Sequence, residues 1–403
     1  MASVLVLAIG EVAVRIGVAC FRPKLSLEAI LKRQREAGFP TIPTRSGVRA
    51  EIVHPYVGFV VDPNLAAGFN QYGFLQVDGP ILKRRPGLTI VGITGGSVAR
   101  DLCQKSSGAL KQRLRELIGA AEIAVVCLAQ EGFHQPQQVM AWSLFRSLGA
   151  EFDYLVNLDG FNDVVLYQKE TGDDFTWFAY PRAWETRLSD TANPELNRLI
   201  GLGVILRQRR MQWAARFHRL ERIPLLSIHM AWNAIDEHYT GAIADVTGQM
   251  QTAKLASLKS YSHTGPAVQF SSNEARIAAL VELWANSSEN LSQMCSGAGT
   301  TYVHCLQPNI GFNRKKSLTE FEQELTTKDR GYQPAAAVGY PELLAKNAEL
   351  RSKGIHFEDL TALYADVAEG VYSDDCCHMT ELGYELLATA VADALGKVDA
   401  ERR

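Results

Sequence analysis

The stretch LTIVGITGGS at residues 88–97 decides the fold. Its first part, Leu88 to Ile93, is a short apolar run rich in β-branched residues, which predicts a buried strand. Two glycines and Ser97 follow, and residues 98–118 then carry the apolar spacing of a helix. A strand that turns through glycines into a helix is typical of a βαβ unit, so this stretch predicts a parallel sheet with right-handed crossovers.

The same alternation continues along the chain and extends the predicted sheet. Further strands are predicted at 122–128, 152–158, 301–306 and 355–359. Helices are predicted at 26–36, 136–148, 193–222, 274–294, 317–326, 340–353 and 380–396. Residues 51–86 predict short strands and loops, 224–232 fit either a strand or a buried helix, and 234–272 predict a polar excursion.

Size and charge limit the class of protein. The 403 residues are 47% hydrophobic and 21% charged, which fits one large α/β domain with excursions or a domain with a small subdomain. The net charge is −3, and the basic stretches at 83–85 and 207–210 are short and lie between apolar segments. Because phosphate binding needs clustered Lys and Arg, we expect no nucleic-acid partner.

The seven cysteines do not form the pattern of a disulfide scaffold. Their spacings exclude a CxxC zinc pair, and no metal site is predicted. Cys295 and Cys305 are close enough in sequence for a bridge, which the sequence alone cannot decide. The compartment therefore stays open between cell envelope and cytoplasm.

The N-terminal segment is the one membrane clue. Residues 2–22 are almost all apolar, but Glu11 and Arg15 interrupt them. This departs both from a spanning helix and from a signal peptide. On a helix the two charges, four residues apart, can pair. The alternatives are a truncated membrane anchor, an interfacial helix and a helix packed on the body.

Polar residues follow three successive predicted strands, namely Ser97, Gly132 and Asn162. Functional groups of a parallel sheet gather at the carboxyl ends of its strands, so we expect these residues to meet. At the start of a helix, Ser97 is close to free N–H groups that can receive a developing oxyanion. The alternative is that Ser97 only caps the helix.

A nucleophilic serine needs a base. Among nine histidines, His378 stands out because Asp375 lies three residues before it. On a loop that enters a helix, this spacing can place a carboxylate beside the imidazole, where it stabilises the imidazolium. The alternative is a surface loop in which Asp374 or Asp375 caps the helix.

Four short blocks, in order, resemble the SGNH (GDSL-like) hydrolase superfamily and span 95–378. They are Gly95-Gly96-Ser97, Gly132, Gly160-Phe161-Asn162-Asp163 and Asp375-Cys376-Cys377-His378. The first block has Gly-Gly-Ser-Val in place of Gly-Asp-Ser-Leu, which leaves the nucleophile intact. The second, at 129–133, has no Asn before its Gly.

The resemblance implies a three-layer α/β/α sandwich with a flavodoxin-like parallel sheet, acyl ester chemistry, and no metal or organic cofactor. It implies Ser97 as nucleophile, His378 as base and Asp375 as its orienting carboxylate. The oxyanion donors would be the N–H groups of Ser97 and Gly132 and the Asn162 amide. The chain would then divide into an N-terminal helix (1–22), an extension that packs on the core (23–86) and a hydrolase domain (87–398) with a large, mainly helical insertion at about 164–272.

Several residues near the predicted triad are weaker candidates for contact with the substrate. His134, Phe161 and Asp163 could line the substrate site, but His134 also suits a helix start and Asp163 also suits a local hydrogen bond. The aromatic residues at 167–184 could form a substrate wall or cover the sheet. Cys377 adjoins His378, a geometry that favours packing over nucleophilic attack.

Three functions from two classes fit these patterns. The leading hypothesis is an ester hydrolase, such as a carbohydrate O-deacetylase or lipid esterase, that acts on a small-molecule, glycan or lipid acyl ester. The second is an O-acyltransferase with the same triad and a sugar hydroxyl as acceptor, which membrane association through residues 2–22 would favour. The third is a non-catalytic binding or scaffold protein on the same fold. The oligomeric state is not predicted.

Overall fold

The computed structural model describes residues 2–22, 25–38, 50–170, 177–187, 194–256, 261–312, 315–327 and 331–402. The chain divides into two compact units. One comprises Met1–Ile52, Asp62–Ala67 and Leu188–Ser260, and the other comprises Val53–Val61, Gly68–Arg187 and Tyr261–Arg403. Each unit is described by itself below.

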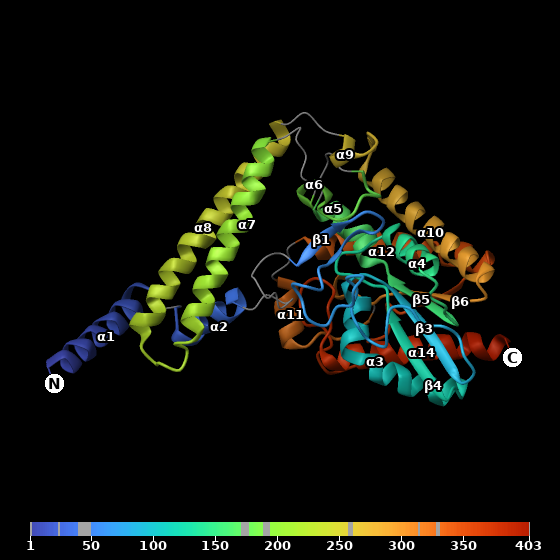
Figure 1. The fold of residues 1–403 in the computed structure, drawn as a ribbon, viewed down its shortest axis with the longest axis horizontal. Coiled ribbons are helices and arrows are strands. Elements are labelled where there is room, and N and C mark those ends of the chain that lie inside the picture. The colour runs from blue at the N-terminus through green and yellow to red at the C-terminus, as the bar shows by residue number, and fades with distance from the viewer. Residues whose placement is uncertain are drawn as a thin grey trace. The chain divides into compact units, whose positions relative to one another are not determined.

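A five-stranded parallel sheet forms the centre of the second unit (Figure 1). Its order, β4-β3-β5-β6-β7, is the 2-1-3-4-5 order of flavodoxin-like folds. The strands are rich in Val, Ile and Leu and are mostly buried, as expected for a parallel sheet covered on both faces. Their bounds are Leu88–Gly95 (β3), Glu122–Cys127 (β4), Tyr154–Asp159 (β5), Thr301–Leu306 (β6) and His356–Asp359 (β7).

Helices cover both faces of this sheet. On one face, α3 (Ser97–Ile118) packs against α14 (Glu381–Arg402), which is the last helix of the chain. The other face carries α4 (Gln137–Ser147), α10 (Asn273–Gly297) and α12 (Tyr332–Ala345). The predicted three-layer α/β/α sandwich is therefore confirmed.

The chain also forms several shorter elements. A two-stranded sheet pairs β1 (Glu51–His54) with β2 (Gly58–Val61). The remaining short helices are a π-helix at Asn162–Leu166, α5 (Tyr167–Glu170), α6 (Trp184–Arg187), α9 (Tyr261–Thr264), a 3-10 turn at Ile310–Phe312, α11 (Glu320–Thr327) and α13 (Asn347–Ser352).

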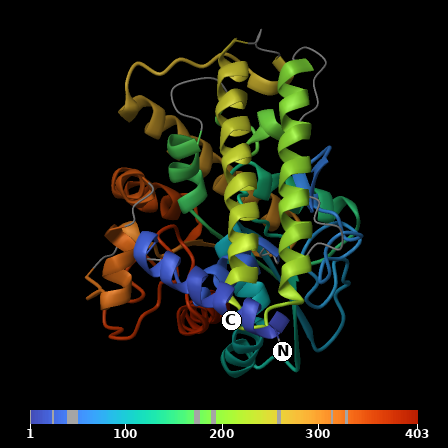
Figure 2. The ribbon, with the colours of Figure 1, turned by 90° about the vertical axis from the view of Figure 1, so that its left-hand side faces the viewer.

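The first unit is helical. The long helices α7 (Pro194–His218) and α8 (Leu226–Ala256) lie side by side (Figure 2). They pack with α1 (Ala2–Phe21) and α2 (Leu27–Gly38) around a small core that includes Ile30, Ala214 and Trp232. The segment Leu188–Ser260 falls within the predicted insertion at 164–272.

The two charges within the apolar N-terminal segment have structural partners. The carboxylate of Glu11 accepts hydrogen bonds from the backbone N–H groups of Leu226 (2.7 Å) and Ser227 (3.0 Å) at the start of α8. Arg15 pairs with Glu11 at 2.8 Å, as the spacing of four residues predicts. Glu11 therefore caps α8 from a distant part of the chain.

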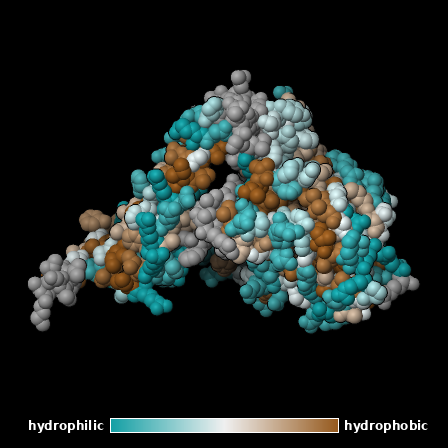
Figure 3. All heavy atoms as spheres, viewed as in Figure 1, coloured by the Kyte–Doolittle hydropathy of each residue, from teal (hydrophilic) through white to brown (hydrophobic). Residues whose placement is uncertain are grey.

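Several apolar side chains of α1 are exposed. Ile9, Val12 and Ile16 are more than half exposed and Phe21 is 87% exposed. Apolar side chains are visible on the face of the molecule that Figure 3 shows. Within the described ranges, none of the helices combines the length and apolar character that crossing a membrane requires.

Three expectations need correction or are now decided. The mainly helical insertion is confirmed, since most of the polar excursion at 234–272 is helical and belongs to α8. The segment 224–232, which fitted a strand or a helix, enters the same helix from Leu226. Cys295 and Cys305 form no bridge, since all seven cysteines are free thiols.

Candidate active site

The carboxyl edge of the sheet brings together the loops that sequence analysis singled out. Ser97 follows β3, and Asn162 follows β5, the direct neighbour of β3. The loop after β4 lies on the other side of β3, and Gln130 in it donates its backbone N–H to Gly95 O at 3.3 Å. Since the strand order reverses at β3, this edge is the topological switch point at which such folds bind ligands.

The turn into α3 depends on two glycines. Gly95 has φ +144°, and a Cβ on it would lie 2.0 Å from the carbonyl oxygen of Leu158 on the neighbouring strand. A Cβ on Gly96 would lie 2.2 Å from the amide nitrogen of Asn162. The glycines therefore let β3 approach β5 closely, and they place Ser97 at the first residue of α3 beside Asn162.

His378 reaches the same edge from the far end of the chain. Its Nε2 lies 2.8 Å from Ser97 Oγ, although the two residues are 281 positions apart. The loop that carries it is closed by an antiparallel bridge between Tyr372 and Met379, and Ser373 donates its N–H to the carbonyl oxygen of His378 at 3.0 Å. The structure thus brings the predicted nucleophile and base within proton-transfer distance.

The carboxylate beside His378 is Asp374, so the assignment of Asp375 needs correction. Asp374 Oδ2 lies 2.5 Å from His378 Nδ1. Its other oxygen, Oδ1, accepts the backbone N–H groups of Cys376, Cys377 and His378 at 3.0–3.1 Å. The loop winds around this one oxygen, and that turn brings residue 374 to the imidazole. Asp375 is 6% exposed and has partners of its own.

The predicted oxyanion donors lie around the start of α3. Asn162 lies beside Gly96 and donates its side-chain N–H to Phe133 O at 2.7 Å. Gly132, the residue before Phe133, has φ +78°, and the side chain of Arg182 lies over it, 2.9 Å from the position a Cβ would take. The loop after β4 and the loop after β5 are therefore joined next to Ser97. Nothing in the sequence pattern marks Arg182 as their neighbour.

Asp163 also links the loop after β4 to the loop after β5. Its carboxylate accepts the backbone N–H of Gln135 at 2.8 Å and that of Gly160 at 3.1 Å. Burial, with the nearby charge of Asp159, raises the pKa of Asp163. Its contacts are those of a residue that holds both loops in register, rather than those of a residue that lines a substrate.

The other two weaker assignments also fall on buried side chains. His134 is 8% exposed, and its Nδ1 lies 2.8 Å from Gln135 O. Burial lowers its pKa, which favours the neutral ring. Phe161 is 1% exposed and packs against Tyr332 in the core. Of the aromatic residues at 167–184, those at 171–176 lie outside the described residues.

A buried polar network supports the end of β5. Asp159 Oδ1 accepts the indole N–H of Trp284 at 2.8 Å and lies 2.9 Å from His304 Nε2. Ser288 Oγ extends this hydrogen-bond network and lies 2.8 Å from His304 Nδ1. The sequence signal was available, since Asp159 and His304 are polar residues within apolar strands, but it does not reveal which of them pair.

Electrostatics favour a strong base at His378. Burial of the ring opposes its charge, yet the hydrogen bond and charge of Asp374 raise the pKa of His378 above its ordinary value, with smaller contributions from Asp101 and Glu131. Burial likewise opposes the charge of Asp374, but its contacts with His378 lower the pKa of that carboxyl. Arg100 pairs with both Asp101 (2.9 Å) and Glu131 (3.1 Å).

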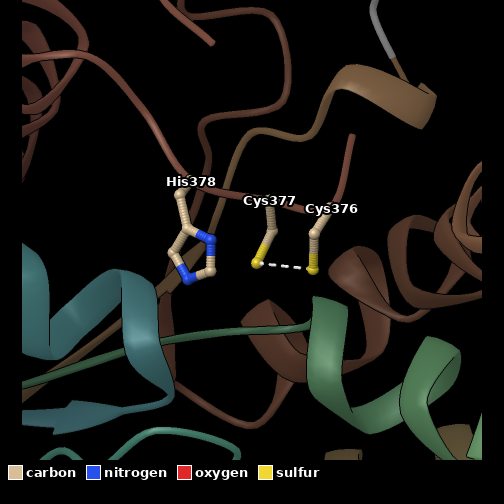
Figure 4. Close-up of side chains that lie close together, drawn as sticks. All are labelled: Cys376, Cys377 and His378. Atoms are coloured by element: carbon tan, nitrogen blue, oxygen red, sulfur yellow. Dashed lines mark hydrogen bonds between the residues drawn. The ribbon is translucent and has the colours of Figure 1, made fainter. Parts of the chain in front are cut away.

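The same loop holds one group with metal-ligand potential. Among the described residues, only Cys376, Cys377 and His378 place three ligand atoms close enough to hold an ion, all within 4.8 Å of one another. Sequence analysis predicted no metal site and assigned Cys377 to packing. Figure 4 shows the two sulfur atoms facing one another on the side of the loop that also carries the imidazole.

Comparison with known proteins adds little to this geometry. No protein-family model matches the chain, and no curated protein matches it. Among solved structures, two variants of Axe2, an acetyl-xylooligosaccharide esterase from Geobacillus Stearmophilus, match 76% of this chain and 94% of their own. Their TM-score is 0.34 and their identity 10%, a likeness that supports no inference about function.

Proposed function

We propose that this protein is an SGNH-type serine hydrolase that cleaves acyl esters through an acyl-enzyme. One observation carries the proposal: Ser97 Oγ lies 2.8 Å from His378 Nε2 while Asp374 holds Nδ1 of the same ring. A serine that merely caps α3 would not need an imidazole supplied from 281 positions away. The resemblance of the four sequence blocks to the SGNH superfamily supports the same function.

In the proposed reaction, Ser97 Oγ attacks the carbonyl carbon of the ester and His378 Nε2 takes its proton. The negative charge of Asp374 stabilises the imidazolium that forms. His378 then returns the proton to the leaving alcohol as the tetrahedral intermediate collapses to an acyl-enzyme. Water, activated by the same imidazole, releases the acid and restores Ser97.

The oxyanion of each tetrahedral intermediate would be held at the start of α3. Proposed donors are the backbone N–H groups of Ser97 and Gly132 and the side-chain amide of Asn162. The amide donates to Phe133 O at 2.7 Å, a bond that fixes its orientation beside Gly96 before substrate binds. One oxyanion donor commonly contributes about 10²–10³ in rate.

The substrate we propose is a carboxylic ester of a glycan, a lipid or a small alcohol. The proposed chemistry uses only the hydroxyl, imidazole, carboxylate and amide groups named above. An O-acyltransferase would use the same acyl-enzyme and differ only in the acceptor. A panel of acyl esters with and without an added glycan acceptor separates free acid from transferred acyl group.

The decisive experiment is labelling with a serine-directed fluorophosphonate probe. We expect the wild type to be labelled and Ser97→Ala to be unlabelled and inactive towards acyl esters. Ser107→Ala is a matched control, because Ser107 is a half-exposed serine of the same helix. An unlabelled wild type, or equal labelling of Ser97→Ala, would rule out the catalytic proposal and favour a binding protein on this fold.

A further inference from the structure

A pair of adjacent thiols next to the proposed base has no role in ester hydrolysis. Cys376 and Cys377 lie 3.4 Å apart, sulfur to sulfur, in the loop that ends at His378 (Figure 4). Both are free thiols. The ligand atoms of all three residues lie within 4.8 Å of one another. Two thiols and an imidazole form a ligand set that suits soft or borderline cations.

The spacing suits tetrahedral zinc. With Zn–S bonds of about 2.3 Å, two sulfur atoms of one tetrahedral site lie about 3.8 Å apart. The observed 3.4 Å therefore requires only a small outward shift of the two side chains. Ser97 Oγ lies 2.8 Å from His378 Nε2, so its hydroxyl is next to this group and can supply a fourth ligand in place of water.

The backbone already holds the three ligands in place. Asp374 Oδ1 accepts the N–H groups of Cys376, Cys377 and His378 at 3.0–3.1 Å. Asn309, from the loop after β6, donates its side-chain N–H to Cys376 O at 2.7 Å. A site whose ligands are oriented before binding spends less of its binding free energy on ordering them.

The site is reachable from solvent. Cys376 is partly exposed, and the side chain of His378 is 28% exposed. Cys377 is 2% exposed and lies between them in Figure 4. A hydrated ion can therefore approach past Cys376 and the imidazole.

From this geometry we infer a second function for the loop: Cys376, Cys377 and His378 bind Zn²⁺ or a similar thiophilic divalent cation, with Ser97 Oγ or a water as fourth ligand. Binding replaces the two thiol protons, which pass to solvent, by two metal–sulfur bonds. This site goes beyond the hydrolysis proposed above.

Occupation of this site would inhibit the hydrolase, a consequence that rests on the proposed function. Both ring nitrogens of His378 are used in the proposed triad, Nδ1 by Asp374 and Nε2 by Ser97. Coordination of either nitrogen displaces one of these contacts. The bound cation therefore removes the imidazole that the proposed reaction uses as its base.

Binding is tested without reference to activity by titrating the reduced full-length protein with Co²⁺, whose thiolate charge-transfer absorption reports Co–S bonds. Three proteins are compared: the wild type, Cys376→Ser and Cys20→Ser. Cys20 is an exposed thiol in the helical unit and controls for non-specific binding. We expect the band in the wild type and in Cys20→Ser, its displacement by Zn²⁺, and its loss in Cys376→Ser. Absence of the band in the wild type, or its persistence in Cys376→Ser, overturns the site.

Inhibition is tested with Zn²⁺ and an acyl ester, each protein being compared with its own metal-free rate. We expect Zn²⁺ to inhibit the wild type, a chelator to reverse this, and Cys376→Ser to need roughly 10–100-fold more Zn²⁺, since loss of even outer-shell partners commonly costs that much in affinity. Equal sensitivity of the two proteins overturns the inhibitory role. A wild type without esterase activity counts against the proposed hydrolase and leaves the Co²⁺ titration to decide the metal site.

Discussion

Two carboxylates in this protein make the same kind of contact and serve different ends. Asp374, in the loop before α14, accepts three backbone N–H groups with one oxygen and holds the His378 imidazole with the other. Glu11, in α1, accepts two backbone N–H groups at the start of α8 and pairs with Arg15. Backbone amides lower the pKa of both acids, against the opposing effect of burial.

The two carboxylates differ in the basic side chain with which each one pairs. Arg15 is a permanent cation, so the ion pair between Glu11 and Arg15 does not change with the protonation of its basic partner, and it can only stabilise the fold. His378 gains and loses a proton near neutral pH, so the Asp374 contact changes strength as the ring is charged. The same capping device is therefore structural in one unit and proposed to be catalytic in the other. Substitutions at the two acids should separate stability from activity.

The largest effect is expected at Asp374. Asp374→Asn removes the charge that stabilises the imidazolium and can leave the ring in the wrong tautomer, so kcat for ester hydrolysis should fall roughly 10⁴-fold. Asp375→Asn is the adjacent control, and its kcat should remain within about tenfold of the wild type, because Asp374 still holds the ring. A greater loss in Asp375→Asn than in Asp374→Asn, measured on folded protein, would restore the assignment that sequence analysis made.

A smaller effect is expected at Asn162, where the group in question is a neutral donor. Asn162→Ala removes a proposed oxyanion contact, and kcat should fall by about 10²–10³ while KM changes little. Steady-state kinetics with one acyl ester measure both constants. An unchanged kcat would mean that the amide only joins the Phe133 loop to α3 and plays no part in the reaction.

Glu11→Gln should reduce stability without reducing kcat. Loss of the charged cap should lower the free energy of unfolding by about 1–2 kcal/mol at pH 7. Glu28→Gln, on the exposed first turn of α2, is the control and should lower it by only a few tenths of this amount. Backbone hydrogen bonds outweigh burial and lower the pKa of Glu11 from 4.5 to about 2, so its stabilisation is present above pH 4.5 and is lost as the pH falls towards 2.

Denaturant unfolding followed by circular dichroism tests this prediction at several pH values. The difference between Glu11→Gln and the wild type should shrink steadily as the pH falls below 4.5. A deficit of the same size at pH 3 and at pH 7 would show that the contact is not electrostatic.

The smallest effect is expected in the pH profile. Hydrolysis needs neutral His378, and the raised pKa of His378 places the acid limb of kcat/KM above the ordinary histidine value of about 6.5. Glu131 contributes a minor part of this rise. Glu131→Gln should therefore move the acid limb to lower pH and raise the relative rate on the acid side. A shift to higher pH would contradict the sign of this interaction.

The parts of the site that the sequence predicted are those set by the sheet. Ser97 and Asn162 each follow an apolar run, and the pairing of β3 with β5 in a parallel sheet brings such positions to one edge. His378 was chosen for its neighbouring acid and its position before a predicted helix. The strands and most helices were also predicted, because apolar spacing decides them.

The parts that were missed depend on polar contacts between distant or irregular segments. Asp374 was passed over because a loop folded around one carboxylate oxygen has no residue spacing that reveals it. The bounds of helix α8 are not predicted, because the helix buries charged groups, such as Asp236 paired with Arg210 at 2.7 Å. A polar side chain predicts exposure until its partner is known.

The close fit between Gly96 and Asn162 restricts how this sequence can change. The Gly-Asp-Ser-Leu block that this chain's first block resembles has an aspartate at the position of Gly96, yet any side chain at 96 would begin 2.2 Å from the amide nitrogen of Asn162. Gly96→Asp would therefore not be a neutral return to the common pattern, since it would displace Asn162 from Phe133. We therefore expect the effect of a substitution at one of these positions to depend on the residue at the other, so a library that varies one should vary both.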